Sequence, residues 1–349
     1  MTFDTAKLGV PVEIGQIGRE LKKLWEADGG TATRASLINF AVYCEGAEMG
    51  GRNTEFIGEF TRDHACRALL IIAEPHAPEM KIQAWINAHC HLSQAGAKQV
   101  CCEQISFLLE GRASKLIPNI VFANLDSDLP LVLWWQAEFP VRIDGQLLSW
   151  VDRLVFDSLK WTQPAKQLNR LLAWLEKSGS HLAMCDLNWT RSLHLRQALA
   201  QMFDHPENRK ILDDMTTVAI CHAADFRSTA LLLVGWFAAQ LKLELKSSEE
   251  DSVVLATEED REIAFDLACE GARSIGCCKI TSPDGSVEVA RDKSGDFFEV
   301  KVRLADGRAY DHLLPAGNNR STSLLTEELA LGGRHRVYIK ALAVAKELL

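Results

Sequence analysis

The first half of the chain shows the apolar periods of both helices and strands. Residues 12–27 place apolar side chains three or four positions apart, which predicts an amphipathic helix that ends at the DGG sequence of 28–30. Residues 36–44 and 67–73 are apolar runs and are predicted strands. The segment between them is expected to supply a helix, so this region begins as strand, helix and strand.

A predicted antiparallel pair follows. Residues 81–92 alternate strictly between apolar and polar positions, which predicts a strand with one buried face. It is expected to pair with residues 100–109 across a short connection that contains Gly96. Residues 115–125 are then predicted to be helical after Pro118.

The sequence PLVLWW, residues 130–135, is an apolar run too short to cross a membrane and suited to a strand buried on both faces. Adjacent side chains of a strand point to opposite faces, so Trp134 and Trp135 are expected to cover both sides of the sheet. Tryptophan is also enriched in binding hot spots, which leaves a ligand or partner surface as the alternative to core packing. Residues 152–158 are predicted to form a further strand, and the alternation of strands and helices predicts an α/β domain with a mixed sheet.

The second half begins with helices. Pro164 is placed to start a helix that is expected to end at Gly179, and another helix is expected after the sequence DLNWTR at 186–191. Residues 216–223 are a predicted strand. Residues 228–241 are apolar nearly all round, which predicts a buried helix.

From about residue 252 the pattern changes to short alternating runs separated by turn sequences. The turns are predicted at 282–285, 293–296 and 305–308, where glycine reaches positive φ without steric cost. These runs predict an antiparallel meander. A closing helical stretch over 321–348 is expected to cover one face of that sheet.

Length and composition support two domains. The 349 residues exceed the roughly 100–200 typical of one domain, and 47% hydrophobic with 24% charged residues is near the globular average. We therefore predict an N-terminal α/β domain with a mixed sheet over 1–185. A C-terminal α+β domain, with the antiparallel meander and closing helices, is predicted over 186–349.

The net charge and the lengths of the apolar runs restrict the classes of partner that the protein is expected to bind. A net charge of −9 without any block of Lys and Arg argues against nucleic acid, because binding phosphates needs a concentrated basic face. No apolar run approaches the ~18 residues of a membrane span. The N-terminal residues lack a signal-peptide pattern, so we expect a cytoplasmic protein.

Common enzyme and cofactor fingerprints are absent from the sequence. It contains no G-x-G-x-x-G, G-x-x-x-x-G-K-[ST], H-E-x-x-H or G-x-S-x-G, so no cofactor is expected. His89 and His91 share one face of a predicted strand and are the candidates for a metal site. Because the sequence identifies no further ligands, we favour the interpretation that both histidines are polar residues on a solvated strand face.

Ten cysteines occur without any C-x-x-C spacing. The adjacent pairs at 101–102 and 277–278 are poor partners within each pair, because neighbouring side chains of a strand point to opposite faces. We expect buried free thiols, with a redox-sensing role as the alternative.

The sequence DLNWTR combines an acid, an aromatic residue and a base at a helix entry. The structural interpretation has Asn188 or Thr190 capping the helix, Trp189 packing, and Asp186 pairing with Arg191. The functional alternative is an interdomain or ligand-facing latch.

Six segments, in this order, resemble the OpcA family of glucose-6-phosphate dehydrogenase assembly proteins. They are CCEQI (101–105), DLPLVLWW (128–135), DRLVFDS (152–158), DLNWTR (186–191), STALLLVGWFAAQL (228–241) and LLTEELALGGRHRVYIKAL (324–342). The resemblance implies a noncatalytic protein that binds glucose-6-phosphate dehydrogenase, promotes its active oligomer and raises its activity. It would thereby control the oxidative pentose phosphate pathway and NADPH supply.

The family-matching positions Trp134, Trp135, Asp186, Trp189 and Arg191 are the candidates for partner-binding or interdomain contacts.

The alternative function is a sugar-phosphate or nucleotide-binding sensor or enzyme. It would use the crevice of the N-terminal domain near the ends of the 130–135 and 152–158 strands. Arg153, Asp157 and Arg191 are the candidates to line that crevice.

Overall fold

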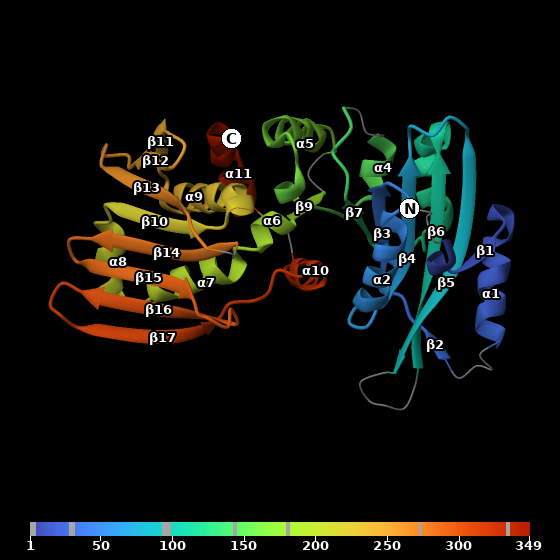
Figure 1. Ribbon diagram of the computed structural model, residues 1–349, viewed down its shortest axis with the longest axis horizontal. Helices are drawn as coiled ribbons and strands as arrows, with labels where there is room; N and C mark the ends of the chain where they lie inside the picture. Colours follow the sequence, from blue (N-terminus) through green and yellow to red (C-terminus); the bar gives the residue numbers. More distant parts are fainter. Residues whose placement is uncertain are drawn as a thin grey trace. The chain divides into compact units, whose positions relative to one another are not determined.

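The computed structural model describes the chain as two compact units (Figure 1). The units are Met1–Phe156 with Asn169–Met184, and Asp157–Leu168 with Cys185–Leu349. The described residues are 5–27, 32–92, 99–141, 145–178, 182–271, 274–332 and 336–349. The predicted element ends at 28–30, Gly96 and Gly179 lie outside them.

The first sheet has nine strands in the described residues, in the order β1-β5-β6-β4-β3-β7-β8-β9 with β2 on β6. Their bounds are β1 Val10–Val12, β2 Ala32–Arg34, β3 Ile38–Glu45, β4 Cys66–Glu74, β5 Lys81–Leu92, β6 Gln99–Glu110, β7 Leu131–Trp135, β8 Arg153–Phe156 and β9 Ala183–Asp186. The strands β6, β4, β3, β7 and β8 pair in parallel, whereas β5 pairs antiparallel with β6 as expected. The predicted mixed sheet is confirmed.

The order of these parallel strands is that of a doubly wound fold. From β3 the chain moves outward through β4 to β6 on one side, and later through β7 and β8 to β9 on the other. The switch point therefore lies between β3 and β7, where open α/β sheets bind ligands beyond the carboxyl ends of the strands.

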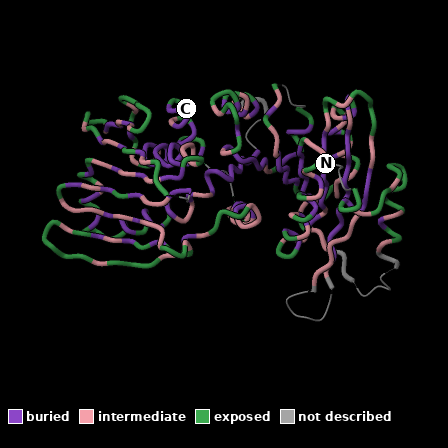
Figure 2. Tube along the Cα trace, viewed as in Figure 1, coloured by how far each residue is buried: buried purple, intermediate pink, exposed green. Residues whose placement is uncertain are grey.

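Helical segments separate and cover these strands. They are the 3-10 segments η1 Thr5–Leu8, η2 Ile14–Gln16 and η3 Gly111–Leu116, with α1 Ile17–Ala27, α2 Met49–Phe60, α3 Ile117–Asn124, α4 Gly145–Trp150 and α5 Pro164–Ser178. Figure 2 shows the burial along the central strands, which is typical of parallel sheets covered on both faces. The strand β5 departs from the prediction, because Trp85 of its expected solvated face is buried. Contacts from η1, α1 and η3 explain this difference.

The β7 strand is buried at all five positions, and its tryptophans occupy opposite faces as expected. Trp134 packs on Phe56 of α2, with ring centroids 4.7 Å apart. Trp135 lies opposite Tyr43 in the register of β3 and stacks on it, with centroids 3.9 Å apart.

In the described residues, the second sheet has eight strands in the order β11-β12-β13-β10-β14-β15-β16-β17. Their bounds are β10 Thr217–His222, β11 Glu244–Ser248, β12 Ser252–Ala256, β13 Glu262–Cys269, β14 Ile275–Ser282, β15 Gly285–Arg291, β16 Phe297–Leu304 and β17 Ala309–Pro315. The predicted hairpins from β14 to β17 form, and the turn residues Gly285, Gly295 and Gly307 have positive φ. The prediction of a continuous antiparallel meander is wrong at one place, because β10 inserts between β13 and β14 and runs parallel to β13.

The helical segments of the second unit are η4 Ser158–Lys160, α6 Leu187–Thr190, α7 Leu193–Met202, α8 Pro206–Asp213, η5 Ala224–Phe226, α9 Arg227–Leu241, α10 Ser321–Ala330 and α11 Arg336–Leu348. The helix α9 is buried as predicted, since it contacts β10 and β13 as well as α11. Gly235 permits the close approach of α11, because a Cβ there would lie 2.3 Å from the Ala341 carbonyl oxygen. In the described residues, the predicted closing stretch forms two helices, α10 and α11. The helix α11 packs mainly on α9. No helix of the described residues is long and apolar enough to cross a bilayer.

Candidate functional site

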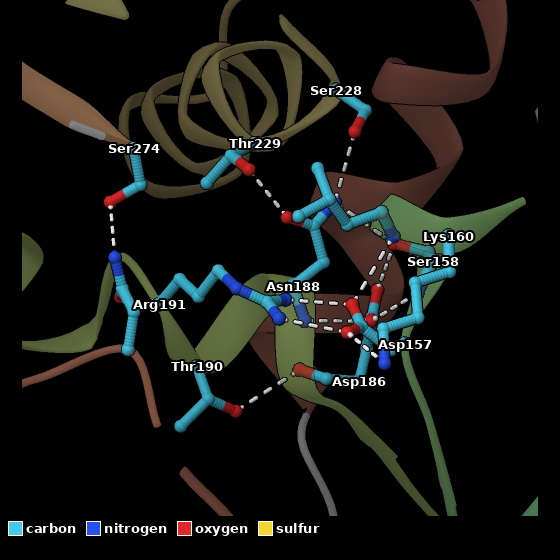
Figure 3. A network of polar contacts seen from close by, with 12 residues as sticks. Asp157, Ser158, Lys160, Asp186, Asn188, Thr190, Arg191, Ser228, Thr229 and Ser274 are labelled. Atoms are coloured by element: carbon cyan, nitrogen blue, oxygen red, sulfur yellow. Dashed lines mark hydrogen bonds and ion pairs between the residues drawn. The ribbon is translucent and has the colours of Figure 1, made fainter. Parts of the chain in front are cut away.

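A buried polar network in the second unit connects the end of β9 to several helices (Figure 3). Its centre is Asp186, a residue that is only 1% exposed. One carboxylate oxygen of Asp186 accepts hydrogen bonds from the backbone N–H groups of Ser158 and Asn188, each at 3.0 Å. The other accepts from the Ser158 hydroxyl at 2.6 Å and from the Tyr338 hydroxyl of α11 at 3.0 Å.

Asp186 therefore caps α6, a role that the sequence interpretation gave to Asn188 or Thr190. The extended backbone at Asp186 lets its carboxylate reach the second N–H of the helix, as N-cap residues do. Asn188 serves the network differently, since its amide group donates to the hydroxyls of Ser158 and Ser228.

The expected pairing of Asp186 with Arg191 is wrong. Arg191 instead forms a two-pronged ion pair with Asp157, at 2.7 and 2.8 Å. Asp157 is fixed just beyond β8, where it caps η4 by accepting from the Leu159 N–H. The planar guanidinium matches both oxygens of one carboxylate, which orients the pair as well as neutralising it. Two of the six family-like segments thus meet through these side chains.

A second layer of the network surrounds Trp189. The Arg196 guanidinium lies 3.5 Å above the Trp189 ring and also donates to the Trp189 carbonyl oxygen. Burial lowers the pKa of Arg196 to about 9, an effect that the nearby Glu328 carboxylate opposes. Thr190 contacts Glu328 through its hydroxyl. Stacking and hydrogen bonds therefore compensate the buried cation.

The network has the properties of a structural joint. Burial raises the pKa of Asp186 to about 6, and the hydrogen bonds from Ser158 and Asn188 oppose that rise. A perturbed carboxyl is a feature of many active sites. Here both carboxylate oxygens already accept two donors each, from protein groups, so the arrangement holds η4, α6 and α11 together.

A second candidate site is the crevice at the switch point of the first unit. A cavity of about 300 Å³ lies there, lined by Tyr43, Glu45, Pro75, Ser114, Lys115, Ile117, Pro118, Trp135, Pro140 and Leu147. These residues come from the ends of β3 and β7 and from the segments that follow β4, β6 and β7, with one from α4. The fold thus places a cavity where doubly wound proteins bind ligands.

The turn from β3 into α2 differs from a phosphate-binding loop. Gly46, with φ of 94°, makes the tight turn, but a Cβ on it would lie 2.4 Å from the Glu48 carboxylate. Glu74, at the end of β4, accepts a hydrogen bond from the Ala47 N–H at 2.6 Å. Two carboxylates therefore adjoin the helix N-terminus that would otherwise attract phosphate, which disfavours a dinucleotide there.

The three candidates to line the crevice, Arg153, Asp157 and Arg191, do not lie together in it. Asp157 and Arg191 pair with each other within the second unit, as described above. Arg153 is the first residue of β8, at the amino end of that strand, so it does not lie at the crevice beyond the carboxyl ends. That part of the prediction is wrong, because a strand places its first and last residues at opposite edges of the sheet.

The two histidine candidates, His89 and His91, lie on β5. His89 bonds to Gln104 at 2.7 Å and His91 to Thr61 at 3.1 Å, so each ring contacts a neutral partner. In the described part of the chain, no three His, Cys, Asp or Glu side chains are placed to hold a metal ion.

Two cysteine pairs correct the expectation of free thiols. Cys90 is bonded to Cys101 between β5 and β6, and Cys221 to Cys277 between β10 and β14. Each pair lies directly opposite in its antiparallel register. Alternation along a strand explains why only one member of each adjacent pair is bonded, and Cys102 and Cys278 stay free and buried.

The candidate positions do not all come together. Trp134 and Trp135 lie in the first unit, at 3% and 5% exposure, and Trp135 lines the cavity. Asp186, Trp189 and Arg191 lie in the second unit, within the network. Sequence reasoning missed the partners that organise this network.

Those missed partners are Ser158, Tyr338 and Glu328. Ser158 ends the family-like segment DRLVFDS, and the other two lie within the last family-like segment. Their presence in those segments was the available signal.

Comparisons with known proteins agree with the sequence resemblance. Two family models match in order: the glucose-6-phosphate dehydrogenase subunit N-terminal domain over residues 58–173, and the corresponding C-terminal domain over 182–342. An OxPP cycle protein OpcA of Nostoc punctiforme is 24% identical over 366 residues, covering 95% of this chain and 78% of that protein. The OpcA of Synechococcus elongatus is 25% identical, covering 75% of this chain and 63% of that protein.

Oxidoreductases are among the solved structures to which the chain shows a weak likeness. The 3-ketoreductase KijD10 of Actinomadura kijaniata has a TM-score of 0.49 and 14% identity, covering 89% of this chain and 95% of its own. An aldose-aldose oxidoreductase from Caulobacter crescentus has a TM-score of 0.48 and 11% identity, covering 89% of this chain and 96% of its own. At these TM-scores and sequence identities, the likeness does not assign the function of these proteins to this chain. Because both halves of the chain match models of one family, it belongs to the OpcA family of glucose-6-phosphate dehydrogenase assembly proteins.

Proposed function

We propose that this protein is a cytoplasmic, noncatalytic assembly factor and allosteric activator of glucose-6-phosphate dehydrogenase. The observation that carries the proposal is the ordered match of both dehydrogenase-subunit domain models, over 58–173 and 182–342. By promoting the active oligomer, the protein raises flux through the oxidative pentose phosphate pathway and the supply of NADPH.

The turn from β3 into α2 supports a noncatalytic role. Hydride transfer by a doubly wound dehydrogenase requires a dinucleotide whose pyrophosphate rests on a helix N-terminus. Here the Glu48 and Glu74 carboxylates adjoin that position. The chain has a doubly wound sheet, whereas the position that cofactor phosphates would occupy carries negative charge.

Activation has a thermodynamic requirement. A partner shifts the dehydrogenase toward its active oligomer only if it binds that state more tightly than the inactive one. A tenfold preference corresponds to about 1.4 kcal/mol of coupling. The complex and the change in activity must therefore saturate at the same concentration of this protein.

The experiment combines an assay with a mass measurement. Glucose-6-phosphate dehydrogenase from the same genome is assayed with increasing amounts of the chain, and the mixture is analysed by size-exclusion chromatography with light scattering. We expect a complex of higher mass and a rise in activity with one common midpoint. Two folded proteins that neither co-elute nor change in activity would overturn the proposal.

We further propose that, within each unit separately, the family-matching side chains support from beneath a surface that binds the dehydrogenase. All five are buried or within the network, so Trp134, Trp135, Asp186, Trp189 and Arg191 are suited to shaping a surface. Trp134→Ala and Arg191→Ala are expected to reduce both stability and activation. If each variant folds and activates like the wild type, this role is lost.

A further inference from the structure

The cavity at the switch point of the first unit has one wall that is apolar and aromatic. The Trp135 indole, held by its stack on Tyr43, and the Leu147 side chain line it but are only 5% and 2% exposed. Three prolines, Pro75, Pro118 and Pro140, complete this wall. Rigid apolar surfaces of this kind match the C–H face of a sugar ring, which loses little hydration on contact with them.

The remaining lining is polar and carries both charges. Lys115 is exposed, and it makes no ion pair with any residue in the described ranges. Glu45 is exposed and accepts a hydrogen bond from the Tyr43 hydroxyl at 2.9 Å, which fixes its orientation. Ser114 donates its hydroxyl hydrogen to the Gly111 carbonyl, so its oxygen remains an acceptor. A ligand that fits these groups has an anionic end for Lys115 and hydroxyl donors for Glu45 and Ser114.

The size and surroundings of the cavity restrict the ligand further. About 300 Å³ is at the lower end of small-molecule sites, which excludes a full dinucleotide. Glu48 and Glu74 repel phosphate from the neighbouring start of α2. The cation for a phosphate is therefore Lys115, in η3, on the side of the cavity that follows β6.

We propose that this cavity binds a compact phosphorylated sugar. Its phosphate contacts Lys115, its hydroxyls donate to Glu45, and its apolar face lies against the accessible surfaces of Pro75 and Pro140. Binding by the isolated chain does not depend on the assembly role. Its action as an effector of the dehydrogenase complex rests on the proposed function.

Isothermal titration calorimetry on the full chain alone, at constant ionic strength, tests the proposal. The probes are glucose 6-phosphate, glucose, inorganic phosphate and NADP. We expect glucose 6-phosphate to bind with a Kd of about 1 mM or tighter, and each of the other probes to bind about tenfold more weakly or not at all. Losing a charge-assisted hydrogen bond on Lys115→Gln is expected to weaken the sugar phosphate about tenfold or more.

Matched variants keep the outcome interpretable. Lys115→Gln and Glu45→Gln change exposed groups, so both are expected to fold, and Glu45→Gln should weaken the sugar phosphate while leaving inorganic phosphate unchanged. The control is Lys23→Gln, which changes a half-exposed lysine of α1 outside the cavity and should leave the Kd unchanged.

Three results would each overturn the proposal. The first is an absence of binding to the wild type at about 10 mM glucose 6-phosphate. The second is equal binding of inorganic phosphate and glucose 6-phosphate, which would mean an anion site only. The third is a loss of dehydrogenase binding on Lys115→Gln without any metabolite binding, which would make the cavity a protein contact. The assembly role stands or falls separately, by its complex and activity assay.

Discussion

Replacing Arg191 with methionine removes the guanidinium from the buried Asp157 carboxylate and keeps much of the aliphatic volume. The two side chains are 7% and 5% exposed, and the pair is joined at both oxygens. The carboxylate keeps the Leu159 N–H at 3.3 Å and the exposed Lys160 ammonium at 3.9 Å. These remaining partners are long contacts and do not replace the lost pair.

The expected cost follows from this geometry. Removing one partner of a buried ion pair costs about 3–5 kcal/mol, and the Lys160 contact places Arg191→Met near the lower end, at about 3 kcal/mol. Asp157→Asn should cost a similar amount, because it leaves the guanidinium buried. The double variant should cost less than the sum, with a coupling of about 2 kcal/mol, since neither charge is then left alone.

The assay is urea unfolding followed by circular dichroism, fitted to the transition of the second unit. Arg308→Met is the matched control, because Arg308 makes an equally direct pair with Glu207 while the side chains are 58% and 46% exposed. This exposed pair should contribute only about 0–1 kcal/mol. A cost for Arg191→Met no larger than that for Arg308→Met, or additive effects of the two changes at 157 and 191, would contradict this expectation.

Three further predictions concern titration, thiols and metal. The pKa of Asp186 is raised to about 6, so its protonated form favours the fold below about pH 4 and this contribution is lost as the pH rises through 6. Asp186→Asn, which does not titrate, should therefore gain about 2 kcal/mol of stability relative to the wild type as the pH rises from 4 to 7, and parallel pH profiles of unfolding would contradict this. Mass spectrometry after labelling should find six reactive thiols in the denatured, unreduced protein and ten after reduction, with Cys269 labelled first in the native state; ten without reduction would disprove the cross-strand pairs. Zinc should leave the Tm unchanged, because His89 and His91 are each bonded to neutral side chains, and a zinc shift abolished by His91→Ala would show otherwise.

Local pattern in the sequence determined most individual elements. The apolar run at 131–135 predicts a strand buried on both faces, because it has no polar position to expose. The turn glycines predict the hairpins of the second sheet, since a positive φ is available to them at no steric cost. The buried helix at 227–241 follows from its apolar surface on all sides. The family could also be recognised from the sequence, because each of its six segments is a continuous stretch of residues and the segments occur in the family's order.

The tertiary structure decided which distant groups meet. Arg191 finds Asp157, 34 positions away, and two cysteines of β5 and β6 meet because the register places them opposite each other. Insertion of β10 beside β13, and the cavity formed beyond four strands, likewise depend on sheet order. Periodicity reports which face of an element is apolar, whereas register and strand order arise from packing between segments that are remote in the sequence. The sequence alone therefore specified the elements and the family, and only the assembled sheets specified the network and the cavity.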